Sequence, residues 1–158
     1  MRVLGVDYGQ RRIGLAVSDP TGLLARPLRV LQRPGGDERT AAASVVQVVS
    51  ELEADGEPIA ALVVGWPRRL DGSPNEQTPL VEAFAAALRQ ASRRPVHLQD
   101  ERLTSHEADQ RLALRERDWR RRKAQLDAAA AAIVLQDYLD QQPLPPALAS
   151  DDPDACAG

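Results

Sequence analysis

Two short apolar runs separated by a turn begin the chain and most constrain its fold. The runs Val3–Val6 and Ile13–Val17 are each of strand length and are bounded by turn residues. The basic turn between them is centred on Gln10-Arg11 and is short enough to join two antiparallel strands. We therefore predict a β-hairpin that carries one carboxylate, Asp7, at the end of its first strand.

Asp7 is notable because the strand before it is otherwise apolar. A carboxylate in such a place has a large desolvation penalty unless a partner compensates for it. Gly5 and Gly9 flank it without side chains, so a ligand or another backbone can approach closely. An isolated Asp-x-Gly is more often a turn cap than a binding site, so the rest of the chain must decide between the two.

Three further strands are predicted. Residues 19–22 (DPTG) form a turn, and residues 23–31 then form a weaker strand in which Pro27 indicates an edge position. Residues 59–64 are entirely apolar, which is typical of a strand covered on both faces. A short last strand spans residues 96–98.

Helices are predicted between and after these later strands. The first begins after the cap Asp37, ends at Gly56 and has an apolar face made by Val45, Val48, Val49 and Leu52. The second begins near Thr78-Pro79, and its expected inward face consists of Leu80, Phe84, Ala87 and Leu88. A third begins at the capping box of Thr104 and Glu107, and the last runs from about Ala124 to Leu139.

This element order predicts an α/β domain with a mixed five-stranded sheet. Three antiparallel strands are followed by two parallel additions, and helices flank the sheet. The 158 residues fit one domain, which we expect to span residues 1–141. Residues 142–158 are rich in Pro, Ala and Asp and have too little apolar content to pack, so we expect a disordered tail.

Composition favours a cytoplasmic protein with no membrane partner. No run approaches the roughly 20 apolar residues of a membrane span, and the chain starts without a signal-peptide pattern. Cys156 is the only cysteine, which excludes an internal disulfide and a thiolate metal cluster. His97 and His106 are a poor basis for catalysis, because a histidine at such positions is more often a packing or surface residue.

Three acidic residues occupy places where acids are unexpected. Asp7 ends the first strand, Glu101 follows the last strand, and Asp127 opens the final, alanine-rich helix. Each alone could be a cap or a surface ion pair. Together they can converge where α/β proteins bind ligands, at the carboxyl ends of strands. Converging carboxylates require a cation, and oxygen ligands select Mg²⁺ or Mn²⁺, most simply two ions bound weakly without substrate.

Four blocks of the chain resemble the YqgF/RuvX family, whose members are described as Holliday junction resolvases or as pre-16S rRNA nucleases. The blocks are GVDYGQRRIGLAVSDP (5–20), VVGWPRRLDGS (63–73), DERLTSHEA (100–108) and LDAAAAAIVLQDYLD (126–140). The resemblance implies a ribonuclease H-like fold and a metal site whose ligands and catalytic carboxylates map onto Asp7, Glu101 and Asp127. This chain departs from the family in having Ala128 where serine is common, and arginines in the loop after Trp66.

The resemblance implies a divalent-metal-dependent endonuclease that hydrolyses phosphodiester bonds of structured nucleic acid. We expect it to process the 5′ end of pre-16S rRNA in ribosome biogenesis, with an rRNA precursor and ribosomal particles as partners. The alternatives are a Holliday junction resolvase that acts on branched DNA and a catalytically silent nucleic-acid-binding module. The Asp-x-Gly hairpin also resembles that of actin/Hsp70-type ATPases, but those need two such domains and a much longer chain.

Clustered basic residues support a polyanionic substrate. The net charge is −3, but residues 140–158 carry four acids and no base, so 20 basic and 19 acidic residues remain without them. The candidate nucleic-acid contacts are Arg11, Arg12, Arg68, Arg69, Arg102, Arg120, Arg121, Arg122 and Lys123. Trp119 could stack on an unpaired base or anchor a loop. The sequence leaves open RNA against DNA, the number of metal ions, and a monomer against a weak homodimer.

Overall fold

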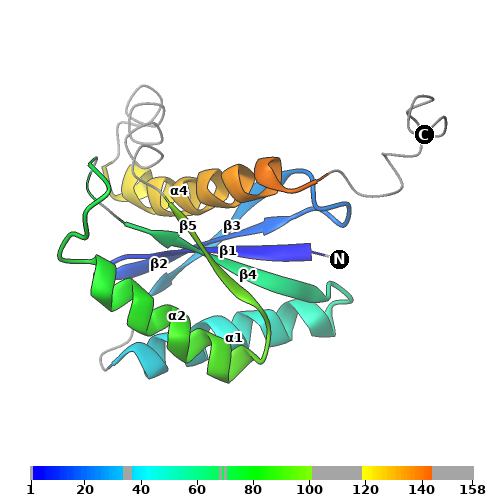
Figure 1. Ribbon diagram of the computed structural model, residues 1–158. Coiled ribbons are helices and arrows are strands. Elements are labelled where there is room, and N and C mark those ends of the chain that lie inside the picture. The colour runs from blue at the N-terminus through cyan, green and yellow to red at the C-terminus, as the bar shows by residue number, and fades with distance from the viewer. Residues whose placement is uncertain (1, 34–36, 68, 70, 101–118, 144–158) are drawn as a thin grey trace.

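The computed structural model describes residues 2–33, 37–67, 69, 71–100 and 119–143, without the side chains of 119–126. Within these residues the chain forms a five-stranded mixed sheet in the order β3-β2-β1-β4-β5 (Figure 1). The strands are β1 (Arg2–Tyr8), β2 (Arg12–Ser18), β3 (Ala25–Gln32), β4 (Ile59–Trp66) and β5 (Val96–Asp100). Strands β1, β2 and β3 pair antiparallel, whereas β4 and β5 are added in parallel. The predicted sheet is confirmed, including the edge position of the strand that contains Pro27.

The hairpin between β1 and β2 has the predicted turn. The Gly9 amide donates to the Arg12 carbonyl at 2.9 Å, which closes the turn around Gln10 and Arg11. The ladder then pairs Asp7 with Gly14 and Leu4 with Val17. This register fixes which residue of β2 lies beside Asp7.

Helices α1 (Glu38–Ala54) and α2 (Thr78–Ser92) cover one face of the sheet (Figure 1). Asp37 caps α1 as predicted and accepts from the amides of Arg39 and Thr40. At the other end the Gly56 amide donates to Glu53 and the Glu57 amide to Leu52, with Gly56 at φ +83°. This Schellman pattern is the helix end that a glycine after the last turn predicts.

One detail of α2 differs from the prediction. Leu80 is 39% exposed, whereas Val81 is buried beside Phe84 and Leu88. At about 100° per residue, Leu80 lies a quarter turn from the centre of the face that these residues form. Leu80 and Phe84 do have the i, i+4 spacing of an apolar helix face. The buried face, however, contains Val81 in place of Leu80.

Helix α4 (Trp119–Gln141) covers the opposite face of the sheet (Figure 1). The described helix begins at Trp119, earlier than the predicted start near Ala124, so the basic segment 119–123 is helical. Ala131, Val134 and Leu135 are fully buried in a second core cluster against Ala16 and Val63. The alanine-rich sequence therefore packs directly on the sheet, as predicted.

Several predictions fall on other parts of the chain. The third helix, expected from Thr104, and most of the tail, residues 144–158, lie outside the described residues. None of the helices described has the length and apolar character needed to cross a membrane.

Candidate functional site

Asp7 lies one residue before the end of β1, on the sheet face that α4 covers. Leu4, Val6 and Tyr8 belong to the core cluster beneath α1 and α2. Because successive side chains of a strand point to opposite faces, Asp7 points to the α4 side. It is partly buried there. A carboxylate that the sequence placed at a strand end is thus directed toward a helix that itself carries an acid.

Gly14 brings that helix close to Asp7. A Cβ atom placed on Gly14 would lie only 2.1 Å from the Asp127 carbonyl oxygen, so only glycine allows this approach. Gly14 is also the residue paired with Asp7 across the hairpin. Residues directly opposite in an antiparallel pair have Cβ positions about 4.5–5.5 Å apart. Asp7 and Asp127 therefore occupy the same end of the same face.

The sequence predicted that Asp127 opens the final helix, and this prediction is wrong. The described α4 begins at Trp119, so roughly two turns of helix precede Asp127. Its place near Asp7 comes from the helix crossing the sheet at Gly14 rather than from a helix terminus. The predicted face is otherwise correct, because Ala130, Ala131 and Val134 are buried.

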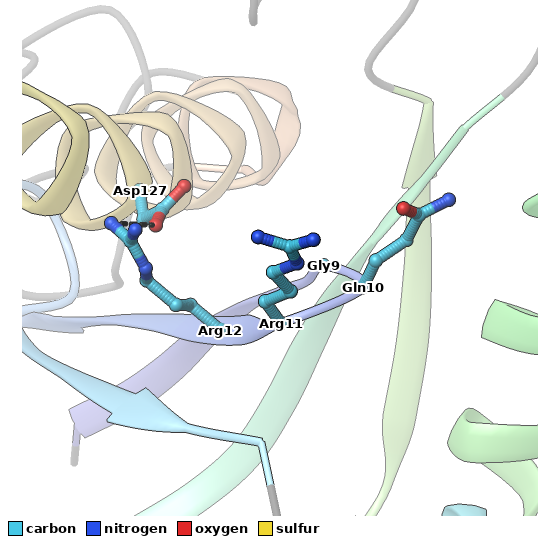
Figure 2. A pocket seen from close by; sticks show the side chains of 5 residues that line it. All are labelled: Gly9, Gln10, Arg11, Arg12 and Asp127. Atoms are coloured by element: carbon cyan, nitrogen blue, oxygen red, sulfur yellow. Dashed lines mark ion pairs between the residues drawn. The ribbon is translucent and has the colours of Figure 1, made fainter.

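An open pocket of about 460 Å³ lies between the hairpin turn and α4. Among the described residues, its lining includes Gly9, Gln10, Arg11, Arg12 and Asp127 (Figure 2). An Arg12 guanidinium nitrogen lies 3.7 Å from an Asp127 carboxylate oxygen, and the two side chains are 21% and 27% exposed. Figure 2 shows the Arg11 side chain rising from the turn beside this ion pair. The pocket thus combines an acid with two cationic groups.

Arg33, just after β3, holds the turn in position. Its guanidinium donates to the carbonyl of Gln10 at 3.3 Å, and its own amide donates to the Arg11 carbonyl at 2.8 Å. The guanidinium also lies 4.5 Å from the centroid of the Tyr8 ring, which stacks on Phe84. Burial raises the pKa of the Tyr8 hydroxyl, against a smaller opposing effect of Arg33. Hydrogen bonds to Arg33 therefore hold the turn, and the Arg33 guanidinium in turn packs over the Tyr8 ring.

The described donors fit a hard divalent cation but do not complete a site. Carboxylate oxygens are the ligands that Mg²⁺ and Mn²⁺ prefer, and Asp7 and Asp127 supply them on one face. Among the described residues, no group of three or more His, Cys, Asp or Glu side chains could hold a metal ion. The third predicted acid, Glu101, follows Asp100 at the end of β5 and lies outside the described residues.

The structure places the predicted basic residues unevenly. Arg11 and Arg12 lie in the pocket with Asp127, whereas Arg69 lines a separate pocket of about 290 Å³ with Asn75, Glu76 and Gln77. Arg68 and Arg102 lie outside the described residues. Arg120, Arg121, Arg122 and Lys123 belong to α4, but their side chains are not among those described.

Sequence reasoning missed two residues that build the site, Gly14 and Arg33. Gly14 was read only as part of an apolar run, although a glycine inside a strand indicates a close backbone approach. Arg33 gave no sequence signal, because its role depends on the pairing of β3 with β2. His97 is exposed and stacks on Tyr138 at 5.3 Å, in agreement with a packing or surface role.

Comparison with known proteins identifies the family. The family model RuvX, described as Holliday junction resolvase, matches residues 1–141. A protein of Anaeromyxobacter dehalogenans (strain 2CP-C) is 42% identical over 90% of this chain and 98% of its own length. One of Lachnospira eligens is 37% identical over 90% of this chain and 99% of its own. Both carry the name "Putative pre-16S rRNA nuclease".

A solved structure supports the fold. The Thermus thermophilus RuvC structure superposes with a TM-score of 0.50 at 20% identity, covering 89% of this chain and 97% of that one. This likeness concerns the architecture of a sheet with helices on both faces. The family model over residues 1–141 and the relatives matched over nearly the whole chain show that this protein belongs to the RuvX family of nucleases, enzymes that hydrolyse phosphodiester bonds.

Proposed function

We propose that this protein is a divalent-metal-dependent endonuclease that processes the 5′ end of pre-16S rRNA. The observation that carries the proposal is the placement of Asp7 and Asp127 at one end of one sheet face, beside a pocket lined by Arg11 and Arg12. The names of the curated relatives favour an rRNA precursor as the substrate.

Asp7, Glu101 and Asp127 would hold the metal, as Mg²⁺ or Mn²⁺. When bound, such ions activate the attacking water and stabilise the leaving oxygen. The protein's own residues have complementary tasks. The carboxylates fix the cations, and the adjacent arginines attract the phosphate backbone that those carboxylates would otherwise repel.

The wider basic set would supply affinity rather than chemistry. Arg120, Arg121, Arg122 and Lys123 occupy the turns of α4 just before Asp127, so a strand bound at the pocket can continue along this helix. Arg68, Arg69 and Arg102 complete the proposed contacts. We further propose that residues 1–141, the range matched by the family model, form the nuclease domain.

The test is cleavage of a labelled RNA that carries the 5′ leader of pre-16S rRNA, measured under single turnover with Mn²⁺ and with a chelator. Wild type should cut only with the ion. Asp7→Asn and Asp127→Asn should each lose at least about 100-fold in rate, because each removes a metal ligand while keeping the side-chain shape. Binding of the RNA, measured by filter retention, should largely survive in both variants.

The matched control is Asp140→Asn, which removes one carboxylate from the exposed far end of the same helix. It should cut at the wild-type rate. Chelator-resistant cleavage, or full activity of Asp7→Asn, would exclude the acidic site as the catalyst. RNA that is bound but never cut would indicate a silent binding module.

A four-way DNA junction in parallel reactions tests the second candidate function. The description of the matching family as Holliday junction resolvase favours this alternative. Cleavage of the junction with no cleavage of the RNA would replace rRNA processing by junction resolution. Both outcomes would retain the same carboxylates and the same metal requirement.

A further inference from the structure

The orientation of the Arg12 side chain is a feature that metal binding alone does not explain. Its guanidinium is directed at Asp127, one of the proposed metal ligands, and both side chains line the pocket (Figure 2). The backbone of Arg12 is fixed by the Gly9–Arg12 hydrogen bond and by the first rung of β2. The backbone of Arg12 is therefore held in place, and its guanidinium lies beside the carboxylate that would bind the metal cation.

We infer that Arg12 is a displaceable counter-ion of Asp127. Its guanidinium neutralises the carboxylate when no divalent ion is bound, and a metal ion must displace it to enter the site. This inference rests on the proposed metal-dependent function and adds a device that regulates the same site. Arg12, once displaced, is available to the phosphate backbone of the substrate.

The charges indicate that the Arg12 guanidinium and a divalent ion would replace each other at Asp127 rather than bind there together. Asp7 and Asp127 share one end of the sheet face, and two carboxylates there repel unless a cation lies near them. A divalent ion held by Asp127 would lie against the carboxylate that the Arg12 guanidinium now faces. Its charge would then lie within a few ångströms of the guanidinium, and two such cations repel each other.

The geometry of the ion pair suits a partner that leaves readily. The distance of 3.7 Å is longer than the 2.7–3.2 Å typical of a hydrogen bond, so the contact is a charge pair without tight alignment. Both side chains are also partly exposed to solvent. Pairs of this kind contribute little to stability, so the competition with metal should be modest.

The experiment is calorimetric titration of Mn²⁺ into the full chain at neutral pH and about 0.15 M salt, where charges beyond about 8 Å are screened. Arg12→Gln should bind Mn²⁺ between about three- and fivefold more tightly than wild type, because the competing guanidinium is absent. Arg12→Lys keeps a cation and should bind within about twofold of wild type.

Arg11→Gln is the matched control. It removes an equal charge from the same turn and the same pocket, whereas the guanidinium found 3.7 Å from Asp127 is that of Arg12. Its effect on Mn²⁺ affinity should stay below about twofold. A gain as large as that of Arg12→Gln would attribute the effect to general electrostatics and overturn the inference.

Asp127→Asn separates this inference from the proposed function. If Asp127→Asn abolishes Mn²⁺ binding while Arg12→Gln binds no more tightly than wild type, the metal site stands and only the counter-ion role is wrong. If wild type and Arg12→Gln both fail to bind Mn²⁺, or bind it independently of Asp127, the proposed metal site falls and the inference falls with it.

Discussion

Asp19 shows how one side chain can shape a loop and make its stability depend on pH. Its carboxylate accepts from the amides of Leu23 and Leu24 at 2.9 and 3.0 Å and from the Thr21 hydroxyl. These bonds, led by that from Leu24, lower the pKa of Asp19 from its ordinary value of 3.8 to about 2. The carboxylate thus organises the turn that separates β2 from β3.

We predict that Asp19→Asn destabilises the protein at neutral pH by roughly 1 kcal/mol, a small value because the group is partly exposed. Since the folded pKa is lowered, the contribution is complete above pH 4 and is lost as the pH falls from about 4 toward 2. Urea unfolding of both proteins at pH 7 and at pH 2.5 checks this. An equal difference at both pH values would contradict it.

Tyr8 presents the opposite case, a buried polar group without a matching partner. Its hydroxyl makes no well-aligned hydrogen bond within the described part of the chain, although the nearby Arg33 guanidinium interacts with it, and the residue is 4% exposed. Tyr8→Phe keeps the ring stacked on Phe84 and removes the burial cost of the hydroxyl. The free energy of unfolding should therefore change by less than about 0.5 kcal/mol or rise. A loss above about 2 kcal/mol would reveal a bond to this hydroxyl.

At the level of single residues, the sequence predicted those features whose cause is local. The Asp37 cap, the Gly56 helix end and the edge position of Pro27 follow from backbone chemistry within a few residues. Gly14 and Arg33 were missed because their roles arise from segments far apart in the sequence. The exposure of Leu80 was missed because both Leu80 and Val81 have helical spacing to Phe84 and Leu88, and the packing of α2 in the folded domain decides which of the two is buried.

Among the elements, α4 decides where the site lies. Its approach to the sheet depends on two glycines, because a Cβ at Gly5 would meet the Leu135 Cβ at 2.7 Å and one at Gly14 would meet the Asp127 carbonyl at 2.1 Å. Sequence patterns predicted a close alanine-rich helix but not its start, since the charged segment 119–123 gives no apolar periodicity. The position of Asp127 two turns inside the helix could not be predicted for the same reason.

We predict that Gly14→Ala destabilises the protein by roughly 2–3 kcal/mol, because α4 must move away from the sheet at Asp127. Cleavage should fall further than stability explains, since Asp127 moves relative to Asp7. Chemical unfolding and single-turnover cleavage below the melting temperature measure the two effects. Gly22→Ala is the control, because its φ of +75° adds strain but nothing lies within 4 Å of the new Cβ.

A fully active Gly14→Ala protein would contradict this account of the site. If it lost stability but kept the wild-type cleavage rate, the contact between β2 and α4 would support the fold without positioning Asp127. The corresponding loss in Gly22→Ala should be about 1 kcal/mol with no change in cleavage.

For the whole molecule, the distribution of charge matters more than its sum. The net charge of −3 includes Asp151, Asp152 and Asp154, all near the C-terminus, whereas the cationic pocket lies between the hairpin and α4. The fold class was predictable because the order of strands and helices admits few sheet topologies. The partition between domain and tail stays a prediction, because it depends on residues beyond those described.

Deletion of residues 143–158 tests that partition. The last helix already ends at Gln141, and residues 140–143 are exposed, so little apolar surface should be lost. We expect the melting temperature to change by less than about 2 °C. The deletion also raises the net charge from −3 to 0, because it removes three acids and no base. Affinity for RNA should therefore rise, more at low than at high salt.

A full-length variant with Asp151, Asp152 and Asp154 changed to Asn is the matched control, since it removes the same charge and keeps the chain. Both proteins should show the same gain in RNA affinity and the same melting temperature as wild type. A drop of many degrees in the truncated protein alone would show that the segment packs against the domain. A gain in affinity confined to the truncated protein would show that the tail obstructs the RNA physically, because charge alone acts equally in both.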